Sequence, residues 1–267
     1  MAKPKRKRVN ISAVCPTYNS SSYISRTLAS LVEQVDAPDE VIFCDDGSND
    51  DTTLILEQWK PLFLERGIDV FINKNDHQGP GAARNCGVKH ARYSWIAFLD
   101  SDDTWLPNKI LTVRKEIEKN PKTSFLLHWE TLVQVDGGHS NLEHGTNYRR
   151  DISTAAQLYQ ENFISTSTVT CRREVIESAG GFDHTLPNAQ DYDLWLKASD
   201  KMNLVIIPII LGECFQTKGS ITSRRYGSRY KSRLRVAWRH RAKGGAIGCL
   251  LKLGKITFSR QWITSYW

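Results

Sequence analysis

Short apolar runs alternate with amphipathic segments through the first 120 residues of the chain. The apolar runs predict strands at residues 9–16, 40–46, 68–74 and 93–100. Stripes with a 3.6-residue period predict helices at residues 23–34, 51–67, 79–92 and 106–120. Strands that are almost continuously apolar and separated by helices are typical of a parallel sheet covered on both faces.

The second half of the chain has a different pattern. Residues 123–135, followed by the turn Asp-Gly-Gly-His, predict antiparallel strands. We expect residues 165–171 to be extended and residues 204–215 to form a pair of strands. Further helices are expected at residues 153–163, 172–180 and 191–203. Because no Pro/Gly/Ser linker interrupts the chain near residue 122, the two patterns indicate two halves of one domain.

Composition narrows the class of protein. The 267 residues are 40% hydrophobic and 24% charged, as in ordinary globular domains. The longest apolar stretches fall short of the roughly 20 residues that a membrane-spanning helix needs. Residues 1–8 are basic and are not followed by an apolar signal segment, so they predict a disordered tail on a cytoplasmic protein.

Cysteine usage and charge add two further expectations. The six cysteines have neither CxxC spacing nor Cys/His ligand spacing, which is typical of reduced core cysteines. The net charge of +7 is concentrated in residues 223–267, where Tyr and Trp lie among the basic residues. Such a segment suits nucleic acid, an anionic membrane face or a solvated surface, and charge alone does not choose among them.

Polar clusters follow the predicted strands of the first half. They occupy residues 16–22, 45–51, 73–81 and 100–103. In parallel sheets, ligands bind beyond the carboxyl ends of the strands, where helix N-termini also point. The positions of these clusters therefore predict a ligand site at one edge of the sheet.

Asp100 and Asp102 are two residues apart after the fourth predicted strand. If the strand continues in extended form, both carboxylates project from one face and suit Mg²⁺ or Mn²⁺ bridging to a diphosphate. The alternative is an acidic loop at the start of the next helix, with Asp103 or Thr104 as its cap.

Asp45 and Asp46 end the second predicted strand, and Gly47 follows them. A carboxylate there can accept from the N3–H of uracil or from ribose hydroxyls. Alternatively, the segment is a turn and helix start, capped by Asn49 or Asp50. Arg84 lies on the helix that begins with glycines, where it can pair bidentately with a phosphate.

Asp191 and Asp193 begin a predicted helix. Acids at a helix start are favoured by the helix dipole alone. The functional interpretation makes Asp191 a general base, within hydrogen-bond reach of an acceptor hydroxyl. The seven histidines form no metal-binding array and are interpreted as ordinary polar positions.

Six segments taken together resemble a known family. They are VNISAVCPTYNSSSYISRTLASLVEQ, EVIFCDDGSNDDT, GPGAARNCGV, WIAFLDSDDTWLPNKI, STSTVTCRREVIESAGGFD and QDYDLWLKAS. Their order and spacing resemble the family-2 inverting glycosyltransferases with a GT-A fold, over roughly Val9 to Thr222. The resemblance implies an α/β fold with a Rossmann-like, mostly parallel sheet flanked by helices. It further implies a nucleotide-sugar half at 9–122, a smaller mixed acceptor half at 123–222 and a basic helical extension at 223–267.

The resemblance also implies roles for individual residues. Pro16, Thr17 and Tyr18 line the nucleotide pocket, and Asp45 or Asp46 contacts the base. Arg84 lies near the diphosphate, and the DxD motif of Asp100, Ser101 and Asp102 holds the ribose and a divalent metal, Mn²⁺ or Mg²⁺. Asp191 is the base that deprotonates the acceptor.

Two positions depart from the family pattern. Gln190 stands where many relatives have Glu, which spares the site a second carboxylate beside the base. Thr217 stands where many carry a His, so the resemblance implies no third protein ligand for the metal at that position.

The implied function is transfer of a sugar, with a UDP-sugar favoured as donor, to a glycan or lipid-linked acceptor of cell-surface polysaccharide synthesis. No nucleic acid partner is expected. The basic extension suits peripheral contact with the inner membrane face, or packing on its own domain or on a dimer partner. Two rivals from other classes are a phosphatase of the haloacid dehalogenase type, with Asp100 as nucleophile, and a silent binding module. The phosphatase family has its DxD on the first strand, whereas three strand–helix units precede Asp100 here.

Overall fold

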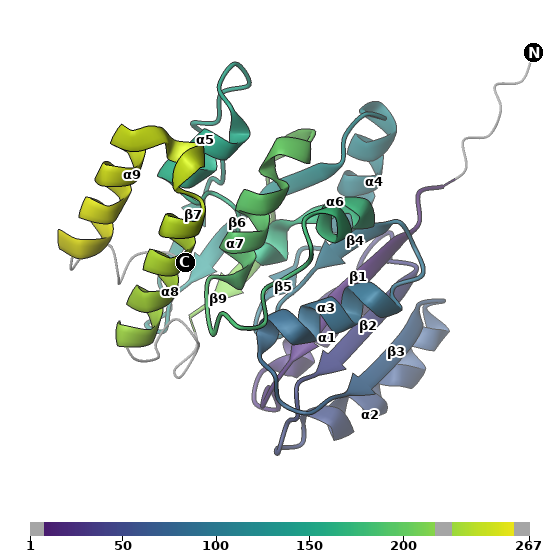
Figure 1. Cartoon of the computed structure of the whole chain (residues 1–267). Helices are drawn as coiled ribbons and strands as arrows, with labels where there is room; N and C mark the ends of the chain where they lie inside the picture. The colour runs from purple at the N-terminus through teal and green to yellow at the C-terminus, as the bar shows by residue number, and fades with distance from the viewer. Residues whose placement is uncertain (1–7, 217–225, 259–267) are drawn as a thin grey trace, which may run out of the picture.

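The computed structural model describes residues 8–216 and 226–258, and it is organised around a nine-stranded sheet (Figure 1). The strands are β1 Ile11–Thr17, β2 Glu40–Asp45, β3 Asp69–Lys74, β4 Trp95–Phe98, β5 Thr104–Trp105, β6 Phe125–Val133, β7 His139–Leu142, β8 Thr170–Arg172 and β9 Leu204–Phe215. Residues 1–7 of the expected tail, Thr217 and residues 259–267 lie outside the described residues.

The sheet combines parallel and antiparallel pairs. Its order is β3-β2-β1-β4-β8-β6-β9-β5, and β7 pairs with β6. The pairs among β3, β2, β1 and β4 are parallel, as is the pair of β6 with β9. The other pairs are antiparallel, including the hairpin of β6 and β7 that the Asp-Gly-Gly-His turn predicted.

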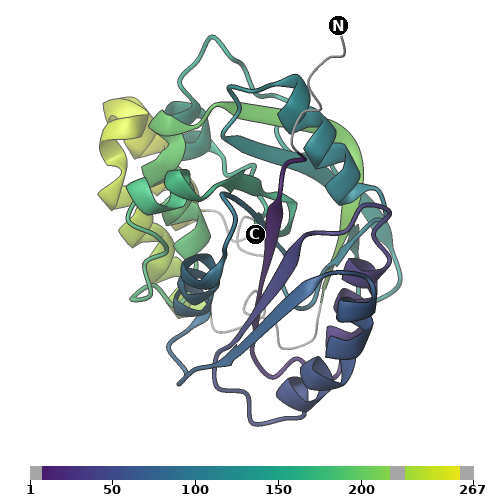
Figure 2. The same cartoon turned by 90° about the vertical axis from the view of Figure 1, so that its right-hand side faces the viewer.

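Helices cover the sheet on both faces. They are α1 Ile24–Val32, α2 Thr52–Glu65, α3 Pro80–His90, α4 Lys109–Lys119, α5 Thr154–Gln160, α6 Arg173–Ser178, α7 Gln190–Ala198, α8 Tyr226–Arg239 and α9 Arg241–Phe258, with 3₁₀ turns η1 Thr166–Thr168 and η2 Ser199–Lys201. After a 90° turn, Figure 2 shows a curved sheet with the C-terminal helices on one side and α2 on the other.

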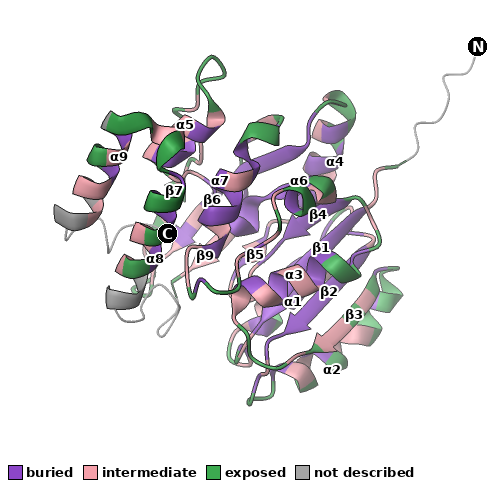
Figure 3. Ribbon diagram, viewed as in Figure 1, coloured by how far each residue is buried: buried purple, intermediate pink, exposed green. Residues whose placement is uncertain are grey.

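The alternation of side chains along the strands explains the two cores. On β1, Val14 belongs to the core that includes Trp195 of α7, whereas Ala13 and Cys15 belong to the opposite core with Leu28 of α1. Figure 3 shows the strands buried almost throughout the centre of the molecule. Helix α3 approaches β1 so closely that a Cβ at Gly87 would lie 2.3 Å from a methyl carbon of Val14.

Two expectations about the second half are wrong. Residues 204–215 form one strand of 12 residues, not two. Pro208 falls at a shift in register, where His128 pairs with Ile207 but Trp129 pairs with Ile210, so its missing N–H breaks no ladder bond. Residues 165–171 are not extended throughout, because η1 occupies Thr166–Thr168.

The C-terminal helices pack against the second half of the sheet domain. Figure 1 shows α8 and α9 beside α5 and α7. The Tyr159 hydroxyl donates to the Ala237 carbonyl at 2.9 Å, and a Cβ at Gly244 would lie 2.3 Å from the Tyr159 ring. In the described part of the chain, every helix is too short or too polar to cross a membrane.

Candidate active site

The acidic segment after β4 is a turn and not a continued strand. The Asp103 amide donates to the Asp100 carbonyl at 3.1 Å, which closes residues 100–103. The premise that an extended strand places Asp100 and Asp102 on one face is therefore wrong. The turn nevertheless brings the DxD segment to the ends of β1 and β4, where the Ser101 hydroxyl lies 2.9 Å from that of Ser20.

Arg84 and Asp100 form the central ion pair of the site. Arg84 Nη2 lies 2.6 Å from Asp100 Oδ1, and the side chains are 7% and 29% exposed, respectively. Burial lowers the pKa of Arg84, but the carboxylates of Asp100, Asp191 and Asp102 raise it by more, so this pKa lies above its ordinary value. Arg84 is therefore a permanent cation among the acids that the sequence singled out.

Only one nitrogen of the Arg84 guanidinium group is used. Nε and Nη1 are buried and have no hydrogen-bond partner within the described chain. Leaving buried donors unpaired costs about 1–3 kcal/mol each. An anionic ligand with several oxygens, such as a phosphate, would satisfy them.

Asp103 is a structural residue and not a helix cap. Its carboxylate accepts from the Ser167 hydroxyl at 2.5 Å and from the Phe215 amide at 3.2 Å. Burial, followed by the charge of Asp102, raises the pKa of Asp103 well above its ordinary value. Asn108 occupies the cap position of α4 and makes no side-chain cap bond, so the expectation of a cap at Asp103 or Thr104 is wrong.

The two acids that end β2 organise different loops. Asp45 accepts from the Thr17 hydroxyl at 3.0 Å and from the Ser48 amide at 2.9 Å. Asp46 accepts from the amides of Gln78 and Gly79, at 2.8 and 2.9 Å, and thereby holds the segment before α3. Both carboxylates thus have protein partners at the edge where the nucleotide pocket is expected.

The remaining residues predicted for the nucleotide pocket lie around these acids. Pro16 and Thr17 are buried at the end of β1. The ring of Tyr18, which is partly exposed, stacks on His77 with centroids 4.4 Å apart. The His77 Nδ1 atom lies 2.8 Å from Asp46 Oδ2, so the ring pair joins the end of β1 to the end of β2.

Asp51 occupies the cap position of α2 and makes no side-chain cap bond, so the expectation of a cap at Asn49 or Asp50 is wrong. Asp50 Oδ1 accepts from the Thr52 amide at 3.0 Å, and its other oxygen accepts from the Ser21 amide at 3.0 Å. Asp50 therefore binds the first residue of α2 while it holds the loop after β1.

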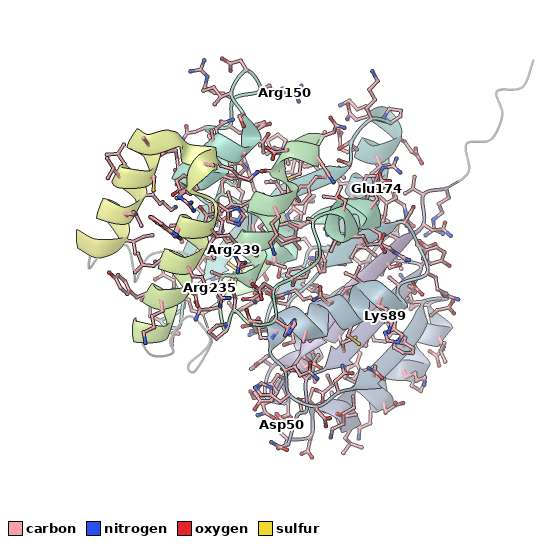
Figure 4. All side chains as sticks on the ribbon, viewed as in Figure 1. Asp50, Lys89, Arg150, Glu174, Arg235 and Arg239 are labelled. Carbon is pink, nitrogen blue, oxygen red and sulfur yellow. The ribbon has the colours of Figure 1, made fainter. Side chains whose placement is uncertain are left out.

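Asp191 and Asp193, two residues apart on α7, have different surroundings. Asp191 accepts from the Thr166 hydroxyl at 3.2 Å, and its charge acts on Arg84. Asp193 is fully buried. Its carboxylate pairs with Lys197, Arg239 and His240, at 2.6, 2.8 and 2.9 Å. Asp191 therefore faces the site, whereas Asp193 fastens α7 to α8 (Arg239 is labelled in Figure 4).

Gln190 lies at the junction of α7 and α3. It is buried, and its Oε1 has no hydrogen-bond partner within the described chain. A Cβ at Gly81 would lie 3.4 Å from its Cγ, so the starts of the two helices abut. This contact places the start of α7 against the start of the helix that carries Arg84.

The sequence-based prediction missed the part that η1 plays. The Ser167 hydroxyl accepts from the Asp100 amide at 3.1 Å and donates to Asp103, while neighbouring Thr166 donates to Asp191. The Trp105 indole donates to the Ser167 carbonyl at 2.9 Å. The Ser-Thr-Ser-Thr run at residues 165–168 is the sequence signal for this turn, but its pattern predicts an extended segment instead.

The mixed sheet and the helices that cover it have the GT-A fold of glycosyltransferases. Residues 1–349 of S. aureus TarS in complex with UDP-GlcNAc match with a TM-score of 0.72 and 22% identity, over 94% of this chain and 74% of that chain. A mannosyltransferase from Pyrobaculum calidifontis, in complex with GDP-Man and Mn²⁺, matches with a TM-score of 0.68 and 17% identity. The match covers 97% of this chain and 73% of the mannosyltransferase chain. At these identities the matches show the shared fold.

The family follows from the sequence comparison. The model of Glycosyl transferase family 2 matches residues 12–180, more than half of the chain, so the chain belongs to this family and is a transferase. The β-1,3-glucosyltransferase WfaP of Escherichia coli, named for UDP-Glc and α-D-GlcNAc-diphosphoundecaprenol, is 28% identical over 195 residues, 72% of this chain and 70% of WfaP.

Other relatives are longer than the matched region. An uncharacterized glycosyltransferase of Haemophilus influenzae is 28% identical over 188 residues, 70% of this chain and 61% of that protein. The chondroitin synthase of Escherichia coli is 31% identical over 193 residues, 71% of this chain but only 26% of the synthase. The shared region is therefore one part of these relatives.

Proposed function

We propose that the protein transfers a sugar from a nucleoside-diphosphate donor, with inversion at the sugar carbon, and that Asp191 is the general base. The observation that carries the proposal is the position of Arg84. Its buried guanidinium pairs with Asp100, responds to the charge of Asp191, and keeps two nitrogens that have no hydrogen-bond partner among the residues that the structure describes. A donor diphosphate would supply the oxygens that these nitrogens lack.

The donor is a UDP-sugar in this proposal. TarS was solved with UDP-GlcNAc and WfaP is named for UDP-Glc, which supports the choice of nucleotide. Pro16, Thr17 and Tyr18 would line the pocket, and Asp45 or Asp46 would accept from the N3–H of the uracil ring. Ser101 lies beside Ser20, where it would meet the ribose.

Asp100 and Asp102 fit a divalent cation by the chemistry of their donors. Carboxylate oxygens are the ligands that Mg²⁺ and Mn²⁺ prefer, and both side chains are partly exposed. The matched mannosyltransferase structure contains Mn²⁺, which supports a divalent ion of this kind. When bound, the ion would act as a Lewis acid that offsets charge on the diphosphate.

The protein side chains divide the remaining chemistry between them. Asp191 would accept the proton of the acceptor hydroxyl as its oxygen attacks the sugar carbon from the face opposite the diphosphate. The C–O bond to the diphosphate breaks as the new bond forms, so no covalent enzyme intermediate is needed. Arg84 would stabilise the negative charge that develops on the leaving group.

The acceptor in this proposal is a lipid-linked glycan for a cell-surface polysaccharide, reached from the cytoplasmic face of the membrane. The name of WfaP, which includes a diphosphoundecaprenol acceptor, supports this class. Trp238, Leu250 and Leu251 on α8 and α9 are exposed by 60%, 72% and 56%. Exposed Arg235 and Arg241 lie on the same helices, so peripheral contact with anionic lipid headgroups is proposed for them.

The test combines donor binding with transfer. Nucleotide sugars are screened for a rise in melting temperature with and without Mn²⁺, since a ligand that binds only the folded state stabilises it. The active donor is then used to compare the parent protein with Asp191→Asn and with Asp151→Asn, a control at an exposed carboxylate.

We expect Asp191→Asn to keep the donor-induced rise and to lose transfer by about 10²–10⁴-fold. Asp151→Asn should retain both properties. Equal transfer rates for Asp191→Asn and the parent would overturn the assignment of the base. No rise with any nucleotide sugar would overturn the proposed donor class.

A further inference from the structure

Two thiols face each other beside the candidate site. Cys44 is fully buried on β2, and half-buried Cys86 lies on α3. Their sulfur atoms are 3.0 Å apart, whereas a disulfide bond is about 2.05 Å long. Both cysteines are free, and a movement of about 1 Å would join them.

The surroundings of Cys86 suit a nucleophile. The side-chain amide nitrogens of Asn73 and Asn75 lie 3.3 and 3.5 Å from the Cys86 sulfur. The Cys44 thiol, on β2, lies 3.0 Å from the same sulfur. Hydrogen bonds from both amides orient this sulfur, and its partial exposure leaves it within reach of a small oxidant. Cys44 is fully buried, and burial raises its pKa, so this thiol enters the reaction second.

We propose that Cys44 and Cys86 are a peroxide-reactive pair that forms a reversible disulfide. The Cys86 thiolate attacks hydrogen peroxide, breaks the O–O bond and becomes a sulfenic acid, with release of hydroxide. The Cys44 sulfur then attacks the Cys86 sulfur, the S–O bond breaks, and the sulfenic oxygen leaves as water with the Cys44 proton. The hydroxide takes up the proton that Cys86 lost when it formed the thiolate, which gives the second water. Two thiols are oxidised to one disulfide, and one peroxide is reduced to two waters.

A metal site is the competing interpretation of the same cluster. Cys44, Cys86 and His90 offer ligand atoms that all lie within 4.8 Å of one another. However, His90 Nδ1 lies 2.9 Å from the Cys86 carbonyl, to which it donates, so only Nε2 of this ring keeps a lone pair for a metal. Tetrahedral zinc with bonds of about 2.3 Å also holds its sulfur ligands roughly 3.8 Å apart, farther than these two lie.

The position of the pair gives the disulfide a consequence for the site. Cys44 directly precedes Asp45, and Cys86 follows Arg84 by two residues. The bond would draw the middle of α3 towards β2 and shift Arg84 relative to the expected nucleotide pocket. We therefore expect slower transfer by the oxidised protein. This consequence rests on the proposed function, whereas the thiol chemistry does not.

The test uses the full chain treated with hydrogen peroxide, with and without later dithiothreitol. Alkylation followed by intact mass measurement should show two fewer reactive thiols per chain, and peptide mapping without reductant should join Cys44 to Cys86. Cys86→Ser should abolish the cross-link. Cys249→Ser removes a half-buried cysteine on α9 and should leave the cross-link intact. Melting temperature should rise on oxidation, since a cross-link constrains the unfolded chain.

Separate outcomes overturn separate claims. Independent oxidation of Cys86 to a sulfinic acid, without a cross-link, would overturn the pair. Zinc that binds the parent but not Cys86→Ser, and that blocks oxidation, would show a metal site instead. A cross-link with an unchanged transfer rate would overturn only the link to the donor site.

Discussion

The carboxylate of Asp100 and the guanidinium of Arg84 form a 2.6 Å ion pair between the end of β4 and the middle of α3. The pair joins one partly exposed side chain to one buried side chain, so the anion faces the open side of the site. The guanidinium of Arg84 is buried, and its Nε and Nη1 atoms have no hydrogen-bond partner in the described part of the chain. This asymmetry suggests that the loss of each partner would have different effects.

Arg84→Lys keeps the charge but removes the planar donors. We expect kcat/KM for the donor to fall by about 10- to 100-fold, because an ammonium group cannot bind two phosphate oxygens in parallel. Initial rates against donor concentration measure the effect. Lys89→Gln is the matched control, since Lys89 lies exposed on the same helix (Figure 4). A similar fall for Lys89→Gln would point to bulk charge instead.

The three acids of the turn should separate into two phenotypes. Asp100→Asn and Asp102→Asn should lose the Mn²⁺-dependent part of donor binding, because each removes a charged oxygen ligand. Asp103→Ala should keep that dependence but lower stability by about 1–3 kcal/mol, since it strands the Ser167 hydroxyl and the Phe215 amide. Calorimetry with UDP measures the Mn²⁺-dependent binding, and denaturant unfolding measures the stability, so the two phenotypes can be distinguished. Metal-dependent binding that survives in Asp102→Asn would contradict the assignment.

Lys109 should make stability depend on pH. It is fully buried, and burial lowers its pKa well below the ordinary value. Between this lowered pKa and the ordinary value of about 10.4, the unfolded chain binds a proton that the folded chain lacks, so stability rises with pH across that range. Lys109→Met should be more stable near neutral pH, by about 1 kcal/mol after loss of the Thr170 hydrogen bond.

The difference between Lys109→Met and the parent is the decisive measurement. Other groups that titrate near pH 10 are common to both proteins and cancel in the difference. We expect the advantage of the variant to shrink between pH 7 and pH 10 in urea unfolding. An advantage that is constant with pH would mean that Lys109 is charged in the folded protein.

Gly87→Ala tests the close approach of α3 to β1. The added Cβ would lie 2.3 Å from Val14, so we expect destabilisation by about 1–3 kcal/mol. The second substitution Val14→Ala should restore the room and offset part of the clash. Gly254→Ala is the control, because nothing lies within 4 Å of its added carbon. Equal thermal unfolding of Gly87→Ala and the parent would show that α3 can shift away.

Replacing both Leu250 and Leu251 by Gln tests membrane contact. Co-sedimentation with anionic vesicles should weaken by at least about tenfold, because burial of one leucine contributes about 1.5–3 kcal/mol. Binding by the parent should also fall at high salt. Leu54→Gln removes an equally exposed leucine from α2 and should have no effect. Unchanged binding by the double variant would exclude this surface as the contact.

The sequence predicted the first half of the fold well because its elements carry strong periodic signals. Strands such as β1 and β2 are fully buried and lie within one or two residues of their expected bounds. The two-residue strand β5 has no periodicity to detect. Pro208 argued for a break in β9, and only the partner strand shows that it falls at a register shift.

The candidate site was predictable as a set of acids but not as an arrangement. Sequence position placed Asp45, Asp100 and Asp191 at element ends. Because β2 and β4 both run parallel to β1, Asp45 and Asp100 lie at the same edge of the sheet, and the charge of Asp191 acts on Arg84 beside Asp100. What the sequence could not show is which carboxylates are already occupied. Along the chain, Asp103 and Asp193 look like Asp100 and Asp191. In the structure, however, Asp103 accepts a hydrogen bond from Ser167 and Asp193 forms an ion pair with Arg239.

The contact of Asp193 with Arg239 and His240 bears on where the protein can be shortened. The family match ends at residue 180, yet the helix that carries Asp191 is held by Arg239 and His240, which lie 46 and 47 residues after Asp193. A chain trimmed at residue 222 would keep every motif of the family and leave Asp193 buried with Lys197 as its remaining described partner. Helix α7 would then lose its anchor to the C-terminal helices, so we expect the smallest unit that folds to be larger than the region by which its relatives are recognised.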